Sequence, residues 1–169
     1  MPVHENIDIL LEQLGNQTLD LVIAKKQENI ELNKNIVFIH LGFLHDVLIT
    51  NSNNPKKDIV FTKKDFENEI IFTPRKISDT TKNLMNTLNL NENNYRFLNN
   101  ETVIDMVKSE NCYGVISKEY IKKEIEDDDI AVLKINFELP KTEYGLYINK
   151  DNKFNELNDL IDIFKKQNF

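Results

Sequence analysis

The sequence predicts an α/β protein built from two lobes. Segments with the apolar spacing of helices alternate along the chain with segments typical of strands. Most of the strand-type segments are continuously apolar, which indicates a sheet covered by helices on both faces. A stretch rich in turn-forming residues, 51–55, separates a first lobe from a second. We expect residues 1–49 and 150–169 to form lobe I, and residues 50–149 to form lobe II.

The first lobe begins with a predicted helix. Residues 5–14 carry isoleucine and leucine at helical spacing with polar residues between them, which is typical of an amphipathic helix. A buried strand is predicted at 19–24. Two further β-rich runs, 35–40 and 46–50, lie on either side of Gly42 and are expected to form two strands.

The second lobe continues the alternation of strands and helices. Pro74 ends a strand at 69–73, and Ser78 is placed to cap a helix that runs to about residue 88. The other predicted elements are a short helix at 63–67, strands at 95–98, 113–116, 130–137 and 143–148, a helix opened by residues 99–102, and helices at 118–126 and 156–166.

Composition excludes several classes of function. The 169 residues include 21 basic and 28 acidic side chains, for a formal net charge of -7. Nucleic-acid binding depends on clustered lysine and arginine, so we expect no direct contact with DNA. The longest apolar stretch, 36–44, contains His40 and is too short to cross a membrane. The start has no signal-peptide pattern and Cys112 is the single cysteine, so we expect a cytoplasmic protein.

The sequence contains no motif typical of catalysis. Its four glycines are isolated, and no nucleophile, base and orienting group can be assigned to one site. Strand alternation places His40 and His45 on opposite faces, which favours ordinary histidines over metal ligands. The acidic run 126–129 is more typical of a solvated turn than of a calcium site. Cys112 is more typical of a packing residue than of a nucleophile. We therefore expect no enzyme activity, no metal and no cofactor.

Polar residues stand where two predicted helices of the second lobe begin, at Ser78 and at 99–102. In open α/β sheets, ligands bind beyond the carboxyl ends of the strands, where helix N-termini present unpaired N–H groups. The same residue types also cap helices when no ligand is present. Capping alone and ligand binding therefore both remain open.

The order of these segments resembles the effector-binding domain of LysR-type transcriptional regulators. The resemblance extends over nearly the whole chain. It is carried by the helix and "Leu-Asp-Leu-Val-Ile" strand at 10–23, the strand and proline at 44–55, and the segment 61–82 with its "Ser-Asp-Thr-Thr-Lys". It continues through 100–107, 113–117, 139–151 and 161–164.

The resemblance implies two Rossmann-like lobes of the periplasmic-binding-protein type, with a small-molecule effector in the cleft between them. It also implies a homo-oligomer, such as a dimer. An anionic effector would suit Lys25, Arg75 and the N–H groups at the two helix starts, because the helix dipole favours negative charge there. The helix-turn-helix of such regulators and the first strand and helix of the domain have no counterpart, so we expect an N-terminally truncated domain. The positions that match the family's effector pocket are Lys25, Thr73, Pro74, Arg75, Ser78, Asn99, Asn100, Glu101, Thr102 and Ser117.

Three other interpretations remain. The same architecture suits a solute-binding protein of the periplasmic type, although the missing signal pattern argues against one. The chain could also be a truncated remnant that binds nothing, or a small α/β enzyme whose catalytic site the sequence does not reveal. A ligand-induced rise in melting temperature distinguishes a sensor from a remnant.

Overall fold

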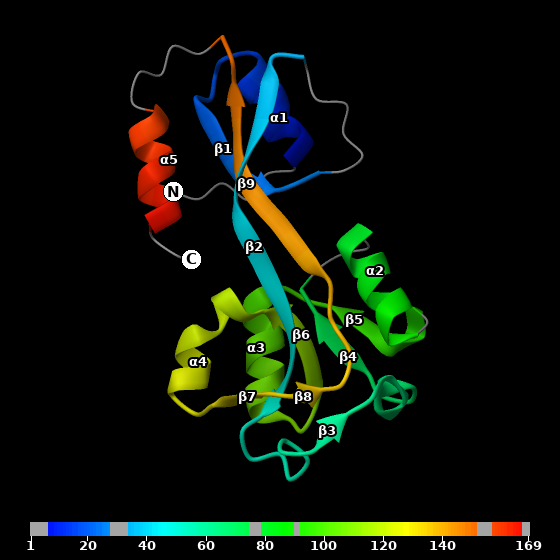
Figure 1. Cartoon of the computed structure of the whole chain (residues 1–169). Helices are drawn as coiled ribbons and strands as arrows, with labels where there is room; N and C mark the ends of the chain where they lie inside the picture. The colour runs from blue at the N-terminus through cyan, green and yellow to red at the C-terminus, as the bar shows by residue number, and fades with distance from the viewer. Residues whose placement is uncertain (1–6, 28–33, 75–78, 90–91, 152–156, 167–169) are drawn as a thin grey trace. The chain divides into compact units, whose positions relative to one another are not determined.

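The computed structural model describes residues 7–27, 34–74, 79–89, 92–151 and 157–166 (Figure 1). Packing divides the chain into two units. The first contains residues 1–43 and 142–169, and the second contains residues 44–141. These divisions lie at 43/44 and 141/142, whereas the sequence analysis placed them at 49/50 and 149/150.

In the described part of the first unit, three strands carry a helix on one face. Its strand order is β1-β9-β2, and β1 pairs with β9 in antiparallel fashion. Helix α1 contributes Leu11 and Leu14 to a core that also contains Val22, Ile36 and Tyr147. The bounds are Ile7–Gly15 for α1, Leu21–Lys25 for β1, Ile36–Asn51 for β2, Lys141–Asn149 for β9 and Leu157–Lys166 for α5.

Strand β2 differs from the prediction because it is continuous where two strands were expected. The sequence suggested a break at Gly42, yet β2 is a single strand of 16 residues that includes Gly42. A Cβ atom at Gly42 would lie 3.1 Å from Cε1 of Tyr144. The glycine therefore makes room for a neighbouring ring and does not end the strand.

The second unit contains a mixed sheet of order β2-β6-β4-β5, with β7 also paired to β2. Strands β4, β5 and β6 are parallel to one another, while β2 is antiparallel to β6 and β7. A separate parallel pair joins β3 to β8. The strand bounds are Val60–Phe61 for β3, Ile71–Thr73 for β4, Tyr95–Phe97 for β5, Tyr113–Ser117 for β6, Ile130–Val132 for β7 and Lys134–Ile135 for β8.

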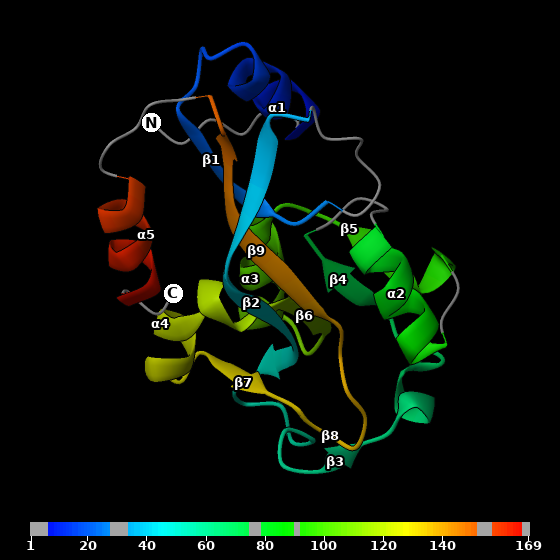
Figure 2. The same ribbon diagram turned by 45° about the horizontal axis from the view of Figure 1, so that its top comes forward.

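Helices cover both faces of this sheet, as the continuously apolar strands predict. Leu84 and Leu88 of α2 belong to the core on one face, and Val107 of α3 and Ile121 belong to the core on the other. Figures 1 and 2 show α2 and α3 on opposite sides of β4. The bounds are Asp79–Leu88 for α2, Asn100–Ser109 for α3 and Lys122–Glu126 for α4, with 3₁₀ turns at Lys63–Phe66, Glu92–Asn94 and Lys118–Tyr120.

The segment predicted as one strand at 130–137 forms two. Strand β7 pairs with β2, whereas β8 pairs with β3 in a different sheet. Leu133 lies between them, where its N–H donates to the carbonyl of Leu48 at 2.9 Å and its side chain is buried. The chain changes partner strands at this residue, and local apolar pattern cannot reveal such a change.

The turn-rich stretch after β2 is an ordered part of the second unit. The buried Asn54 donates through Nδ2 to the hydroxyl of Thr50 at 2.8 Å, and that hydroxyl donates to the carbonyl of Cys112 at 3.0 Å. The Asn54 side-chain oxygen also accepts from the N–H of Lys56 at 2.9 Å. Asparagine forms such local bonds readily, which explains a folded turn where the composition suggests a linker.

Candidate functional site

Three parallel strands of the second unit end at the same edge of the sheet. Ile71 of β4 lies opposite Tyr95 of β5 and opposite Tyr113 of β6, and Thr73 lies opposite Phe97. Because the strands are parallel and in register, the residues that follow them gather at one edge. Here this is called the carboxyl edge: Thr73, Pro74, residues 99–102 and Ser117. Ligands of open α/β sheets bind at such edges.

Helix α3 begins at the carboxyl edge with a side-chain cap. The Asn99 side-chain oxygen accepts from the N–H of Thr102 at 2.7 Å, and its carbonyl accepts from Val103 at 3.0 Å. The buried Thr73 is tied to the same turn, because its carbonyl accepts from the N–H of Leu98 at 3.1 Å. The helix begins within the predicted segment 99–102 with Asn99 as its cap, and the start of α3 is thereby fixed beside the end of β4.

Ser117, at the end of β6, is held by a buried carboxylate that sequence reasoning missed. Its hydroxyl donates to Oδ1 of Asp46 at 2.8 Å, and the two residues lie opposite each other in β2 and β6. Ser117 is 1% exposed and Asp46 is 8% exposed. The available signal was a single aspartate in the apolar run 44–50, but its partner is 71 positions away in the chain.

His45, next to Asp46, is bound by a second acidic residue. Glu119 accepts from the backbone N–H of His45 at 3.2 Å and meets its ring nitrogen Nδ1 at 3.1 Å. His45 and Asp46 also line a pocket of about 230 Å³ within the second unit. Its remaining walls are Val47, Leu48, Val132, Leu133, Ile135 and residues 138–141. None of the predicted effector residues that the structure describes lines this pocket.

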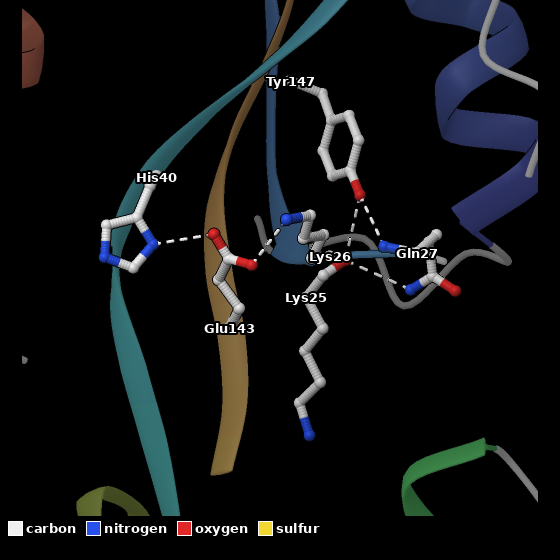
Figure 3. A network of polar contacts seen from close by, with 6 residues as sticks. All are labelled: Lys25, Lys26, Gln27, His40, Glu143 and Tyr147. Carbon is white, nitrogen blue, oxygen red and sulfur yellow. Dashed lines mark hydrogen bonds and ion pairs between the residues drawn. The ribbon is translucent and has the colours of Figure 1, made fainter. Parts of the chain in front are cut away.

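Lys25 lies in the first unit, at the end of β1, beside a polar network (Figure 3). Its carbonyl accepts from the Tyr147 hydroxyl at 3.3 Å and from the Gln27 side chain at 3.1 Å. Burial raises the pKa of the Tyr147 hydroxyl, which also accepts from the Gln27 N–H at 2.8 Å. In Figure 3 the Lys25 ammonium group points away from Glu143.

Glu143 is the acidic centre of that network. Its two oxygens lie 2.7 Å from Nζ of Lys26 and 2.9 Å from Nδ1 of His40. The hydrogen bond from Lys26, with a second from His40, holds the pKa of this carboxyl below its usual range. The ring nitrogen of His40 thus contacts a carboxylate oxygen, which agrees with the interpretation of His40 as an ordinary residue.

The structure places the remaining candidates as follows. Pro74 is half-buried directly after β4, Asn100 and Thr102 are half-buried, and Asn99 and Glu101 are exposed. Arg75 and Ser78 lie outside the described residues. All the described candidates except Lys25 lie in the second unit.

Cys112 behaves as a half-buried packing residue. Its thiol donates to the carbonyl of Met106 at 3.4 Å, and burial raises its pKa, which makes it a poor nucleophile at neutral pH. In the acidic run 126–129, Asp129 pairs with Nζ of Lys108 at 2.5 Å. Within the described residues, no group of three or more potential metal ligands comes together, and no helix is long and apolar enough to span a membrane.

Comparison with known proteins agrees with this geometry. Residues 3–168 match the sequence model of the LysR substrate binding domain. No curated protein matches the chain. The family is a ligand-binding regulatory domain of transcription regulators.

Similar solved structures are regulatory domains of LysR-family proteins. The regulatory domain of MetR from N. meningitidis is 19% identical with a TM-score of 0.66, over 93% of this chain and 76% of that one. The OxyR2 regulatory domain C206S mutant from Vibrio vulnificus is 15% identical, with a TM-score of 0.74. The match covers 96% of this chain and 78% of that one. The CcmR regulatory domain from Synechocystis PCC6803, in complex with 2-PG, is 15% identical, with a TM-score of 0.72. The match covers 96% of this chain and 79% of that one.

Proposed function

This chain belongs to the LysR substrate-binding domain family, and we propose that its small-molecule effector binds at the carboxyl edge of the second unit. One observation carries this placement. The ends of β4, β5 and β6 and the start of α3 bring hydroxyl groups, an amide cap and helix N–H groups to one edge of the sheet. Such groups recognise a small polar molecule by hydrogen bonds.

We propose that the effector is anionic. The first N–H groups of a helix have no partner within the helix, and the helix dipole favours negative charge at this end. Glu101 opposes such a ligand because it is the acidic residue in the first turn of α3, and it is exposed. An anion at this edge is therefore expected to lie on the side of α3 away from Glu101.

The other properties proposed for this chain follow from its family and charge. We propose that it catalyses no reaction, since the family is a ligand-binding regulatory domain. With a net charge of -7, it is expected to make no direct contact with DNA. A cytoplasmic location and a homo-oligomeric state are proposed as well.

The experiment is a thermal-shift screen of the full chain against carboxylate and phosphate metabolites. A ligand that binds only the folded state raises the melting temperature, and the rise grows with the logarithm of the ligand concentration above the dissociation constant. Thr102→Phe places a ring at the carboxyl edge and is expected to abolish the shift. Asp105→Phe adds the same ring at an exposed position further along α3 and is expected to preserve it.

Two further variants test the charge and the family-derived contacts. Glu101→Gln removes a negative charge and is expected to tighten binding of an anion about two- to fivefold. Lys25→Met and Arg75→Met test the two basic residues that the resemblance assigns to the effector. A ligand whose binding is unaffected by Thr102→Phe contradicts the placement, and weaker binding in Glu101→Gln contradicts an anionic ligand.

A further inference from the structure

The pocket of about 230 Å³ in the second unit lies where β7 leaves β2. Strand β7 pairs with β2 at 49–51, and just beyond this pairing the N–H of Leu133 donates to the carbonyl of Leu48. The chain then turns to pair with β3 as β8. Residues 45–48 of β2, residues 132–135 except Lys134, and residues 138–141 border the pocket. The change of partner strand therefore leaves a hollow beside β2.

Most of the residues that line this pocket are apolar, among them Val47, Leu133 and Leu139. An engineered protein cavity of about 150 Å³ with a comparable apolar lining binds benzene. The larger volume here accommodates one aromatic ring together with a small substituent. Removing the surface of such a ring from water favours its binding, so the body of a suitable ligand is apolar.

His45 is the polar residue of this wall whose hydrogen-bonding state the structure defines. Glu119 accepts from the backbone N–H of His45 at 3.2 Å, and its other oxygen lies 3.1 Å from ring nitrogen Nδ1. An ionised carboxylate can only accept, so Nδ1 carries the proton. In the neutral ring, Nε2 is then an acceptor. No described residue donates to Nε2, and the His45 side chain is 51% exposed.

The other polar groups of the wall favour neither an anion nor a cation. Glu138 and Lys141 are both exposed and carry opposite charges. The carboxylate of Asp46 accepts from the Ser117 hydroxyl. A ligand that presents only lone pairs is repelled by the lone pair on Nε2 of His45, whereas an O–H group donates to it. The polar part of a suitable ligand is therefore an uncharged donor.

We propose that this pocket binds a small neutral molecule of the phenol class. Its ring lies among the apolar side chains, and its hydroxyl donates to Nε2 of His45. Glu119 is a positioning residue, because it fixes which nitrogen of His45 accepts. This site and the anion site proposed at the carboxyl edge depend on different residues and on ligands of different charge.

Titration calorimetry of the full chain with phenol, at about pH 8 where phenol is neutral, tests this site. We expect a dissociation constant of about 1 mM or tighter. Toluene has the same shape without the donor and is the reference ligand. His45→Phe is expected to weaken phenol binding about fivefold and to leave toluene binding within about twofold.

A matched pair of variants tests the positioning role. Glu119→Gln lets an amide donate to Nδ1, so that Nε2 can carry the proton instead. Phenol binding is expected to weaken about two- to threefold, with toluene binding unchanged. His40→Phe is the control, because the ring of His40 contacts Glu143 in the same way at 2.9 Å but does not line the pocket. It should bind phenol like the unmodified chain.

Each outcome decides the proposal. An absence of binding up to about 10 mM phenol overturns it, and so does equal phenol affinity in His45→Phe and the unmodified chain. In an amide NMR spectrum, phenol should shift the signals of Val47, Leu48 and Leu133 most, and largest shifts at 99–102 would also overturn it. If circular dichroism shows that His45→Phe is unfolded, Glu119→Gln decides. Thr102→Phe should retain phenol binding, so either site can fail without the other.

Discussion

At the scale of single residues, Tyr95 illustrates a polar group that the fold buries without compensation. The residue is 2% exposed in the core between β5 and α2, and its hydroxyl has no hydrogen-bond partner among the described residues. Burial also raises the pKa of this hydroxyl. A buried polar group without a partner costs free energy that an apolar group of similar shape does not.

Removing that hydroxyl is expected to stabilise the protein. Tyr95→Phe should raise the free energy of unfolding by about 1 kcal/mol, measured by urea denaturation. Tyr120→Phe, at a residue that is 54% exposed, is the matched control and should change it little. A clear loss of stability in Tyr95→Phe would show that the hydroxyl is hydrogen-bonded after all.

Glu143 gives a pH dependence whose sign follows from its contacts. Lys26 and His40 lower its pKa below the usual 4.5. A carboxyl whose pKa is depressed in the folded state stabilises the protein above its unfolded pKa, and this stabilisation is lost as pH falls through the folded value. Stability should therefore decline below about pH 4.5, and less steeply in Glu143→Gln.

The measurement is a series of urea denaturation curves at decreasing pH. Glu138→Gln, at an exposed residue in the same region of the sequence, should follow the unmodified chain. Equal pH dependence in both variants would mean that Glu143 contributes nothing specific.

Residues whose partners are near in sequence could be predicted, and those with distant partners could not. The cap at Asn99 depends on an N–H three residues away, so the local pattern was sufficient. The bonds of Ser117 to Asp46 and of Glu119 to His45 join residues that are 71 and 74 positions apart. Such pairs are set by the strand register, which a single sequence does not show.

At the scale of elements, the close approach of β9 to β2 depends on a glycine. A Cβ atom at Gly145 would lie 2.1 Å from the carbonyl oxygen of Ile39 and 2.6 Å from the ring of Phe38. A backbone oxygen cannot move aside without disturbing the strand that carries it. At Gly42, by contrast, the nearest atoms belong to the ring of Tyr144, the far end of a side chain.

Alanine substitutions should distinguish the two glycines. Gly145→Ala is expected to lower the free energy of unfolding by about 3 kcal/mol, because the two strands must separate to admit the methyl group. Gly42→Ala should cost less than about 1 kcal/mol, since the Tyr144 ring can turn. Thermal unfolding of both variants measures the difference, and equal losses would contradict this account.

Helices were easier to predict than strands in this chain. Helical spacing and capping are local, so α1 and α5 begin and end within a few residues of their predicted positions, and α3 begins where a helix start was predicted. Strands depend on distant partners. This dependence explains why β2 continues through Gly42, and why the apolar run at 130–137 divides between two sheets.

At the scale of the whole molecule, the two units differ in how the chain builds them. The second unit is one continuous segment, 44–141, with an apolar core on each face of its sheet. The first unit needs two segments from opposite ends of the sequence. The alternation of elements predicted the α/β class, but composition alone did not show where the units divide, because the turn at 51–55 resembles a linker.

The second unit is therefore expected to fold on its own. A fragment of residues 44–141 should unfold cooperatively on heating, with the near-ultraviolet circular dichroism of packed tyrosine rings. It should also retain measurable affinity for an effector that binds the carboxyl edge. A fragment that shows secondary structure without a cooperative transition would mean that the second unit requires the first.

Strand β2 has a consequence for how this sequence can change over evolutionary time. Successive side chains in the second half of β2 point to opposite faces of the sheet. Leu48 lies in the core on one face, and Ile49 lies in the core on the other. Inserting or deleting one residue there would exchange the two faces and carry Asp46 away from Ser117. Substitutions can accumulate along this strand, but changes in its length cannot. Homologous chains are therefore expected to differ in length in the loops and to keep β2 free of gaps.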